Sequence, residues 1–177
     1  MEEKDHISYD HGGASSGDVM KVIDFYNRGD KHGEGNSYGN LGDAYYRLGD
    51  FEKAKEYYNL HLQIAKEVGD KHGEGNAHGN LGNVYYSLGD FKKAIEHYNL
   101  HLQIAKEDGD KQREGNAYGS LGNLYHSLGD LKKAIKYHNL HCKVAKEIGD
   151  KHGEGKADGN LGNAYYRLGD FRSEEHT

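Results

Sequence analysis

The sequence of 177 residues contains no proline and one cysteine, Cys142. A single cysteine excludes an internal disulfide framework and fits a reducing compartment. No apolar stretch approaches the roughly 18 residues of a membrane-spanning helix. The acidic N-terminus has no apolar run behind it that would form a signal peptide. We therefore expect a cytoplasmic protein that does not insert into a membrane.

Clusters of basic residues are also missing. Lys and Arg number 23 against 29 Asp and Glu, so the formal net charge is −6 at pH 7. A chain of this charge has no electrostatic attraction for nucleic acid or for an anionic membrane surface. We expect neither to be a partner.

The chain instead has a repeat of forty residues. The segment 69–76 recurs almost letter for letter from Gly29, Gly109 and Gly149. A fixed period of this length indicates stacked supersecondary units that bury their apolar faces on one another. Such an array has an extended surface and no single deep pocket, so we expect a non-catalytic protein that needs no cofactor.

One unit reads as a pair of helices. Leu81, Val84, Tyr85 and Leu88 follow the spacing i, i+3, i+4 and i+7 of one helical face. A Leu-Gly-Asp turn then leads into a second amphipathic helix. The pattern predicts first helices at 31–47, 71–87, 111–127 and 151–167, and second helices at 51–68, 91–108 and 131–148.

The 26 glycines occupy fixed repeat positions, which excludes a flexible linker. Gly69 and Gly89 follow helical segments, where a left-handed residue ends a helix. Others fall inside the first helix of each pair, where each costs about 1 kcal/mol relative to alanine. We expect some of them to allow close approach of helices.

The unit resembles the tetratricopeptide repeat. The matching residues are Leu81-Gly82, Tyr85, Gly89, Ala94 and Tyr98, which recur forty residues earlier and, with His138 in the last place, forty residues later. The forty-residue length, Gly-Asn-Leu-Gly-Asn-x-Tyr and Ile-Ala-Lys-Glu are similar to the LGN/Pins group. The resemblance implies an all-α, right-handed superhelical solenoid of antiparallel helix pairs.

The resemblance also implies a function. The first helices would line a concave groove that binds a protein or peptide, and LGN/Pins relatives would be adaptors in polarity and G-protein signalling. Their GoLoco motif does not occur in these 177 residues. The alternative is a regulatory sensor array of a larger enzyme or nucleotide-binding protein.

A polar stripe on the first helices is the candidate peptide-binding site. It lies nearly opposite the apolar face, and asparagine can both donate to and accept from a peptide backbone. The alternative is a solvated face that repeats because the unit was duplicated. The candidate residues are Asn36, Asp43, Tyr46, Asn76, Asn83, Tyr86, Asn116, Asn123, His126, Asn163 and Tyr166.

Histidines are numerous, but we expect no metal site. His97 and His101, and likewise His138 and Cys142, have the i, i+4 spacing of zinc ligands, yet no third ligand lies nearby in sequence. The periodic histidines, one on each second helix, are expected to serve as packing residues or to stack on the surface between neighbouring second helices, and a pH-sensitive array is the alternative. They are His61, His101 and His141.

The two ends depart from the repeat. Residues 1–28 are expected to form a disordered leader and, at 19–26, a degenerate helix. The array covers 29–171, with three full repeats and a fourth first helix. Residues 172–177 read like the translation of a sequencing adapter, so we expect a truncated reading frame; a divergent native tail is the alternative. An uncapped last helix would allow end-to-end self-association.

Overall fold

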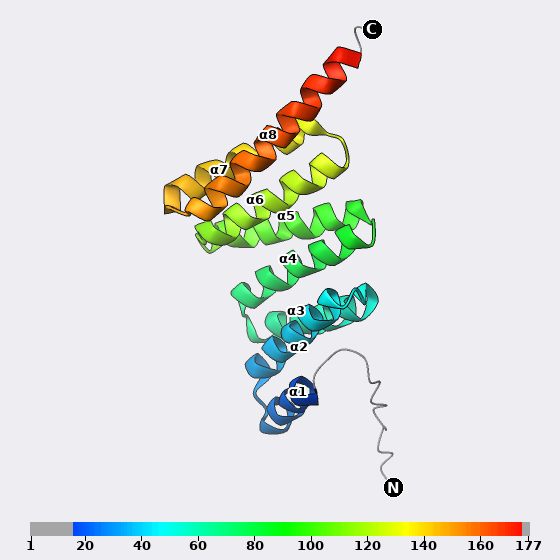
Figure 1. Cartoon of the computed structure of the whole chain (residues 1–177). Coiled ribbons are helices and arrows are strands. Elements are labelled where there is room, and N and C mark those ends of the chain that lie inside the picture. The colour runs from blue at the N-terminus through cyan, green and yellow to red at the C-terminus, as the bar shows by residue number, and fades with distance from the viewer. Residues whose placement is uncertain (1–15, 175–177) are drawn as a thin grey trace.

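The computed structural model describes residues 16–174, and these form eight helices and no strand. The helices run in sequence from one end of a superhelix to the other (Figure 1). Their bounds are α1 Ser16–Arg28, α2 Lys31–Arg47, α3 Phe51–Val68, α4 Lys71–Ser87, α5 Phe91–Glu107, α6 Lys111–Ser127, α7 Leu131–Ile148 and α8 Lys151–Glu174. The predicted all-α solenoid is confirmed. None of the described helices is long and apolar enough to cross a bilayer.

From α2 to α8 each helix start is fixed by an aspartate, and each turn before it by a glycine. The Asp70 carboxylate accepts a hydrogen bond from the Gly73 N–H at 2.8 Å, which satisfies one of the free amides of the first turn of α4. Gly89, between α4 and α5, has a φ of +77°, a conformation that side chains disfavour. The same pair of devices recurs in every turn from Gly29 to Asp150.

The units are antiparallel pairs. We call α2, α4, α6 and α8 the A helices, and α3, α5 and α7 the B helices. Each B helix packs against the A helix before it and the A helix after it. One core cluster therefore joins Tyr45 of α2, Tyr58 of α3 and Leu81 of α4, all buried. The core is a continuous chain of such clusters rather than one centre.

The glycines inside the A helices receive the side chains of the B helices. An ideal Cβ on Gly82 would lie 2.5 Å from the Tyr98 ring, and one on Gly79 would lie 2.9 Å from His101 Nδ1. The expected close approach is confirmed. The periodic histidines are buried packing residues, as expected, but each imidazole lies on a glycine of its own A helix, in the place that a Cβ would fill, rather than between neighbouring B helices.

The last A helix differs from the prediction. The repeat pattern ends it at 167, but α8 continues to Glu174. The Leu-Gly-Asp-Phe segment at 168–171 matches the turn at 48–51, where Ala54 and Tyr58 then become buried. After Phe171 the sequence offers no such apolar residues, so a turn would bury nothing, and a continued helix keeps its backbone hydrogen bonds.

At the other end, α1 is the helix expected near 19–26, although it begins earlier, at Ser16. Phe25 of α1 lies over Gly33 of α2. The leader expected over the first residues lies outside the described part of the chain, as does the end of the 172–177 tail.

Candidate peptide-binding groove

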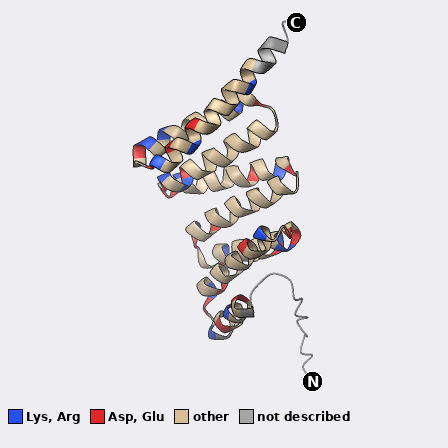
Figure 2. Ribbon diagram, viewed as in Figure 1, with Lys and Arg blue, Asp and Glu red and all other residues tan. Residues whose placement is uncertain are grey.

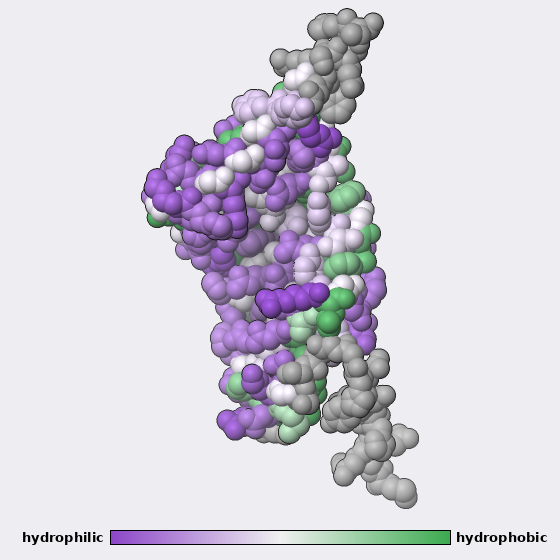
Figure 3. Space-filling view, viewed as in Figure 1, coloured by the Kyte–Doolittle hydropathy of each residue, from purple (hydrophilic) through white to green (hydrophobic). Residues whose placement is uncertain are grey.

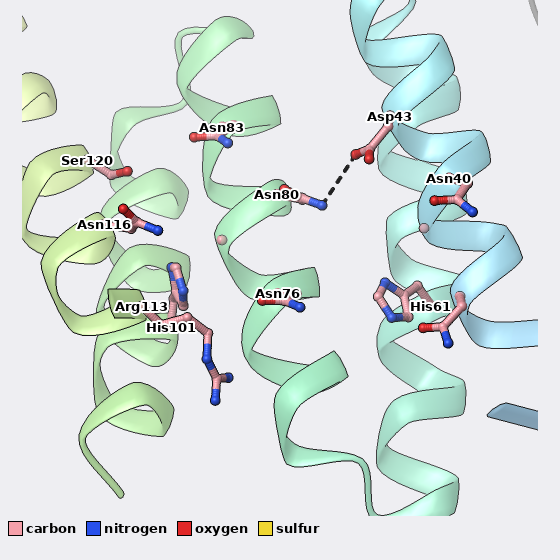
Figure 4. A pocket seen from close by; sticks show the side chains of 13 residues that line it. Asn40, Asp43, His61, Asn76, Asn80, Asn83, His101, Arg113, Asn116 and Ser120 are labelled. Carbon is pink, nitrogen blue, oxygen red and sulfur yellow. Dashed lines mark hydrogen bonds between the residues drawn. The ribbon is translucent and has the colours of Figure 1, made fainter. Parts of the chain in front are cut away.

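A polar groove runs across the A helices. It consists of two adjoining hollows of about 480 and 400 Å³, spanning α2, α4 and α6. Figure 4 shows the first hollow, with side chains from all three helices and two B-helix imidazoles directed into it. A ligand in this groove would cross the helices and contact successive repeats.

The structure brings nine of the eleven predicted residues to this groove. The first hollow is lined by Asn36, Asp43, Asn76, Asn83 and Asn116, and the second by Tyr46, Asn83, Tyr86, Asn123 and His126. Asn163 and Tyr166 of α8 line neither hollow. The fourth A helix thus extends the stripe in sequence but not the groove as formed here.

The asparagines divide into two groups. Asn36, Asn76 and Asn116 make no side-chain hydrogen bond to any other residue of 16–174. Asn83 Oδ1 instead accepts from the Tyr98 hydroxyl at 2.8 Å, and Asn123 Oδ1 accepts from Asn160 at 3.1 Å. The first group has both donor and acceptor available, whereas the second is partly engaged in holding the fold.

Asp43 stands where the later repeats have asparagine. Its carboxylate accepts from the Tyr58 hydroxyl at 2.6 Å and from Asn80 Nδ2 at 3.5 Å. Burial of the ring, followed by the hydrogen bond to Asp43, raises the pKa of Tyr58 well above its usual value, so the phenol remains a donor. Asp43 is thereby held on the wall of the groove, with its Asn80 contact visible in Figure 4.

The predicted tyrosines connect successive repeats. The Tyr46 hydroxyl lies 3.0 Å from Ser87 Oγ, and the Tyr86 hydroxyl lies 2.6 Å from Ser127 Oγ. Each pair is 41 residues apart and joins the C-terminal ends of two neighbouring A helices. These rings therefore offer a flat face to a ligand while their hydroxyls set the spacing of the helices.

The predicted stripe omits a second row of polar residues. Asn40, Asn80 and Ser120 lie one helical turn from the free asparagines and line the first hollow with them. The signal was present in the sequence, since positions 36, 40 and 43 are spaced i, i+4 and i+7 on one helical face. The wall of the first hollow therefore carries two rows of polar side chains, most of them amides.

Two imidazoles form the floor of the first hollow. His61 and His101 are buried, and His61 Nδ1 and His101 Nε2 have no hydrogen-bond partner among the described residues. Burial, with a smaller effect from Arg113, lowers the pKa of His101 to about 4, and burial lowers that of His61. At neutral pH both rings are uncharged.

Arg113 is the one cation of this hollow, and the repeat comparison alone could have marked it, because Gly33, Gly73 and Gly153 hold the equivalent positions. Its guanidinium donates to Asp110 at 2.8 Å and Asp108 at 2.9 Å. Two carboxylates thus neutralise it, and the hollow has no free positive charge.

The wider surface agrees with this neutral character. Figure 2 shows charged residues mainly near helix ends, while the middles of α4 and α6 carry none. Figure 3 shows a mostly hydrophilic face with hydrophobic residues gathered along one edge. Ligand binding in the groove would therefore depend on hydrogen bonds and ring contacts rather than on ionic attraction.

The members of the two i, i+4 pairs, which were not expected to bind metal, have separate partners. His97 pairs with His78, with 3.0 Å between their Nδ1 atoms, while His101 lies on Gly79. Cys142 Sγ donates to Asp158 at 3.3 Å. No group of three potential metal ligands occurs within the described residues.

The helix pairs, the turn glycines and the groove across the A helices define a helical-repeat solenoid with a binding face. A model of the tetratricopeptide repeat matches residues 19–67, 33–107 and 73–147. The chain therefore belongs to the tetratricopeptide repeat family. No curated protein sequence matches it significantly.

Several solved structures share the fold. BtubC (BKLC) from P. vanneervenii is 25% identical with a TM-score of 0.73, over 90% of this chain and 70% of that one. The signal transduction ATPase with numerous domains from Pyrococcus horikoshii, which has a tetratricopeptide repeat sensor, is 24% identical with a TM-score of 0.72, over 85% of this chain and 26% of that one. The TPR2AB domain of yeast Sti1, in complex with pHSP90, is 24% identical with a TM-score of 0.67, over 81% of this chain and 50% of that one.

Proposed function

We propose that this protein is a non-catalytic interaction scaffold whose groove across α2, α4 and α6 binds an extended or helical peptide segment of a partner protein. The observation that carries the proposal is the row of free amides at Asn36, Asn76 and Asn116, which recurs on three helices of one hollow. A peptide laid across the helices meets the same donor and acceptor on each repeat.

The preferred ligand is uncharged where it lies in the groove. Asp43 would repel an acidic side chain, and Arg113 is already paired with Asp108 and Asp110. A ligand charge that is desolvated here without a partner is costly. Peptide backbone and neutral polar or aromatic side chains fit the amides and the rings of Tyr46 and Tyr86.

Two biological settings are compatible with this activity. The LGN/Pins resemblance favours an adaptor in polarity or G-protein signalling, with the partner protein held in the groove. The shared fold with the Pyrococcus ATPase, which has a tetratricopeptide repeat sensor, favours a regulatory array whose ligand controls another domain. Both settings require the same binding groove and differ in the response that ligand binding triggers.

The test uses a phage-displayed library of random dodecapeptides, panned against the full chain, with recovered peptides titrated by fluorescence anisotropy. Asn76→Ala with Asn116→Ala removes two free amides and should weaken binding at least about tenfold. Helicity should not fall, because alanine favours helix more than asparagine does.

The matched control is Asn99→Ala with Asn139→Ala, which removes two exposed asparagines from the B helices. It should leave the affinity unchanged. If the groove variant binds as well as the control, or if no peptide is recovered, the groove is a solvated face and the proposal is wrong.

A further inference from the structure

The two imidazoles on the floor of the groove are equivalent in sequence but not in exposure. His61 and His101 lie forty residues apart, and each ring rests on a glycine of the A helix before it, Gly39 or Gly79. His61 makes no hydrogen bond with any described residue, and its Nδ1 is buried while its Nε2 is open to solvent. In His101 the buried nitrogen without a partner is Nε2. The surroundings of Nε2 therefore distinguish the two positions.

Arg113 accounts for this difference. Its Nη1 lies 2.8 Å from the place that a Cβ on Gly75 would occupy, so the guanidinium reaches from α6 across to α4. Figure 4 shows this side chain beside the His101 ring. The equivalent residue of α4 is Gly73, which has no side chain to extend over His61. The junction between α4 and α6 is therefore plugged, and the junction between α2 and α4 is open.

The open nitrogen of His61 is a hydrogen-bond donor. Burial lowers the pKa of this ring, so at pH 7 it is neutral and carries one proton. A proton on Nδ1 would form an N–H buried against Gly39 without an acceptor, which is unfavourable. A proton on Nε2 can instead be bound by water or by a ligand. The ring thus presents one N–H to the hollow, while its lone pair faces the glycine.

The groups around this N–H restrict what can bind to it. The carboxylates of Asp70 and Asp43 lie close enough to His61 to oppose the lowering of its pKa, so an anionic acceptor would be repelled. A lysine or arginine side chain has no acceptor to offer. Asn36 lines the hollow beside His61 and has a free amide, which can both donate and accept. The ligand group that matches these two residues is neutral and also does both.

We propose that the open imidazole of His61 is the specificity site of the groove and takes a primary carboxamide, the side chain of a glutamine or asparagine in the bound peptide. The carboxamide oxygen accepts from His61 Nε2, and the carboxamide NH2 donates to Asn36 Oδ1. Both ends of the planar amide are then satisfied. The inference rests on the proposed function, because the carboxamide belongs to the peptide that lies across α2, α4 and α6.

Within the described residues, the groove holds one such site. The third histidine of the series, His141, also has an open Nε2, but it lines neither hollow. Its neighbour on α8 is Lys156, a cation in the place where α4 and α6 carry Asn76 and Asn116. A single anchoring position would fix the register in which a peptide lies on amides that otherwise repeat.

The experiment pans the random dodecapeptide library against three forms of the full chain and sequences the recovered peptides. The unmodified chain should enrich glutamine and asparagine together at one position of the aligned peptides, by at least the factor of about fivefold that one hydrogen bond supplies. Val68→Asp with Gly73→Arg copies Asp108 and Arg113 onto the open junction. This plugged variant should still recover peptides but lose the enrichment.

The matched control is Ile148→Asp with Gly153→Arg, which places the same two charges at the junction between α6 and α8, outside both hollows. It should retain the enrichment. In both variants the new arginine can pair with the aspartate that caps its helix, as Arg113 pairs with Asp110, so the fold is retained.

A second measurement needs no variant of the chain. Long-range proton–nitrogen NMR spectra at pH 7 should show His61 as the Nε2–H tautomer, and a recovered glutamine peptide should shift this nitrogen. The same peptide with methionine in place of the glutamine keeps the length but not the amide. It should bind at least about tenfold more weakly, because it leaves the N–H unpaired.

The outcomes separate this inference from the groove itself. Peptides without carboxamide enrichment, enrichment that survives in the plugged variant, or an Nδ1–H tautomer would overturn the inference and leave the proposed function standing. Serine or threonine at the anchoring position would overturn it in favour of a hydroxyl ligand. Recovery of no peptide from any form would overturn the proposed function and this inference together.

Discussion

The first and last helices of the described array, α1 and α8, present different outer faces. At the N-terminal end, α1 covers α2 and turns a charged face outward, with ion pairs between Lys21 and Asp18 and between Arg28 and Asp24. At the C-terminal end, α8 presents a glycine face with an exposed Tyr165 beside it. Within the described residues, the outer face of α1 is charged, whereas α8 carries the glycine face of the interior A helices.

The comparison shows what the glycines are for. A glycine in a helix costs about 1 kcal/mol relative to alanine, and the cost is the same in α4 and in α8. In α4 the Tyr98 ring occupies the space beside Gly82, whereas the space beside Gly162 in α8 is empty. The glycine row is therefore useful only where a second helix covers it.

The largest effect should come from giving α1 the side chains that a B helix packs onto the glycines of an A helix. The variant Asp18→Tyr, Lys21→His, Asp24→Ile places the residues of α3 on the outer face of α1. Its two ends are then complementary but not self-complementary, so association is head-to-tail and does not close. Sedimentation velocity should show oligomers that grow with concentration.

The unmodified chain is the first control, and it should not assemble through α1. Adding Gly162→Leu to the triple variant blocks the other end and should restore the smaller species. A triple variant that sediments like the unmodified chain would show that the two faces are not complementary.

The next largest effect is the difference in the free energy of unfolding between glycine-to-alanine substitutions at two equivalent positions, Gly82 and Gly162. Gly82→Ala places a Cβ 2.5 Å from the Tyr98 ring, which its hydroxyl bond to Asn83 holds in place, and should lower the free energy of unfolding by about 1–3 kcal/mol. Gly162→Ala meets nothing and should raise it by up to about 1 kcal/mol. Urea denaturation followed by circular dichroism measures both, and equal signs would contradict the difference in packing.

Acid should destabilise the covered interior. Burial, with a smaller effect from His97, lowers the pKa of His78 to about 4, and burial lowers that of His97. The unfolded chain protonates near pH 6.5, so stability is complete above that pH and falls as the pH drops toward 4, by at most about 1.4 kcal/mol per pH unit for each proton.

The variant His78→Tyr with His97→Tyr copies the stacked Tyr38–Tyr57 pair of the first repeat and should lose less stability between pH 7 and pH 5. Urea midpoints at the two pH values measure the difference. An unchanged pH dependence would show that this pair is not what acid titrates.

The smallest effect should come from the charges of α1. Asp24 and Arg28 form an exposed pair at 2.8 Å, and such pairs contribute about 0–1 kcal/mol. Asp24→Ala should therefore change the urea midpoint little, with no change in sedimentation. A loss as large as that of Gly82→Ala would mean that the pair stabilises α1 rather than only keeping its face polar.

The sequence predicts most of the helices because each unit is locally consistent. An aspartate cap, an apolar face and a turn glycine agree in the first three pairs, and the predicted bounds differ from the observed ones by at most one residue at α5. The prediction fails at 168–171. The sequence Leu-Gly-Asp-Phe forms a turn at 48–51, but the same sequence at 168–171 is part of the helix α8. That turn depends on burial of the following helix, which a local pattern does not contain.

The candidate groove is predictable to a similar degree. The stripe spacing placed Asn36, Asn76 and Asn116 on one face, and the structure brings them into one hollow. It could not show that Asn83 and Asn123 already have partners, because those bonds come from residues 15 and 37 positions away. The imidazoles of His61 and His101 reach the floor of the first hollow because Gly39 and Gly79 have no side chain to exclude them.

Hydrogen exchange by NMR on the unmodified chain tests most directly whether coverage, and not sequence, separates α8 from the interior A helices. Segments 77–83 and 157–163 differ at one residue, His78 against Asp158, so their intrinsic exchange rates are nearly matched. We predict that amides of 157–163 exchange at least about tenfold faster than those of 77–83, because local opening there breaks packing on one side only. Equal protection of the two segments would contradict the account, since it would mean that the glycine face of α8 is already covered.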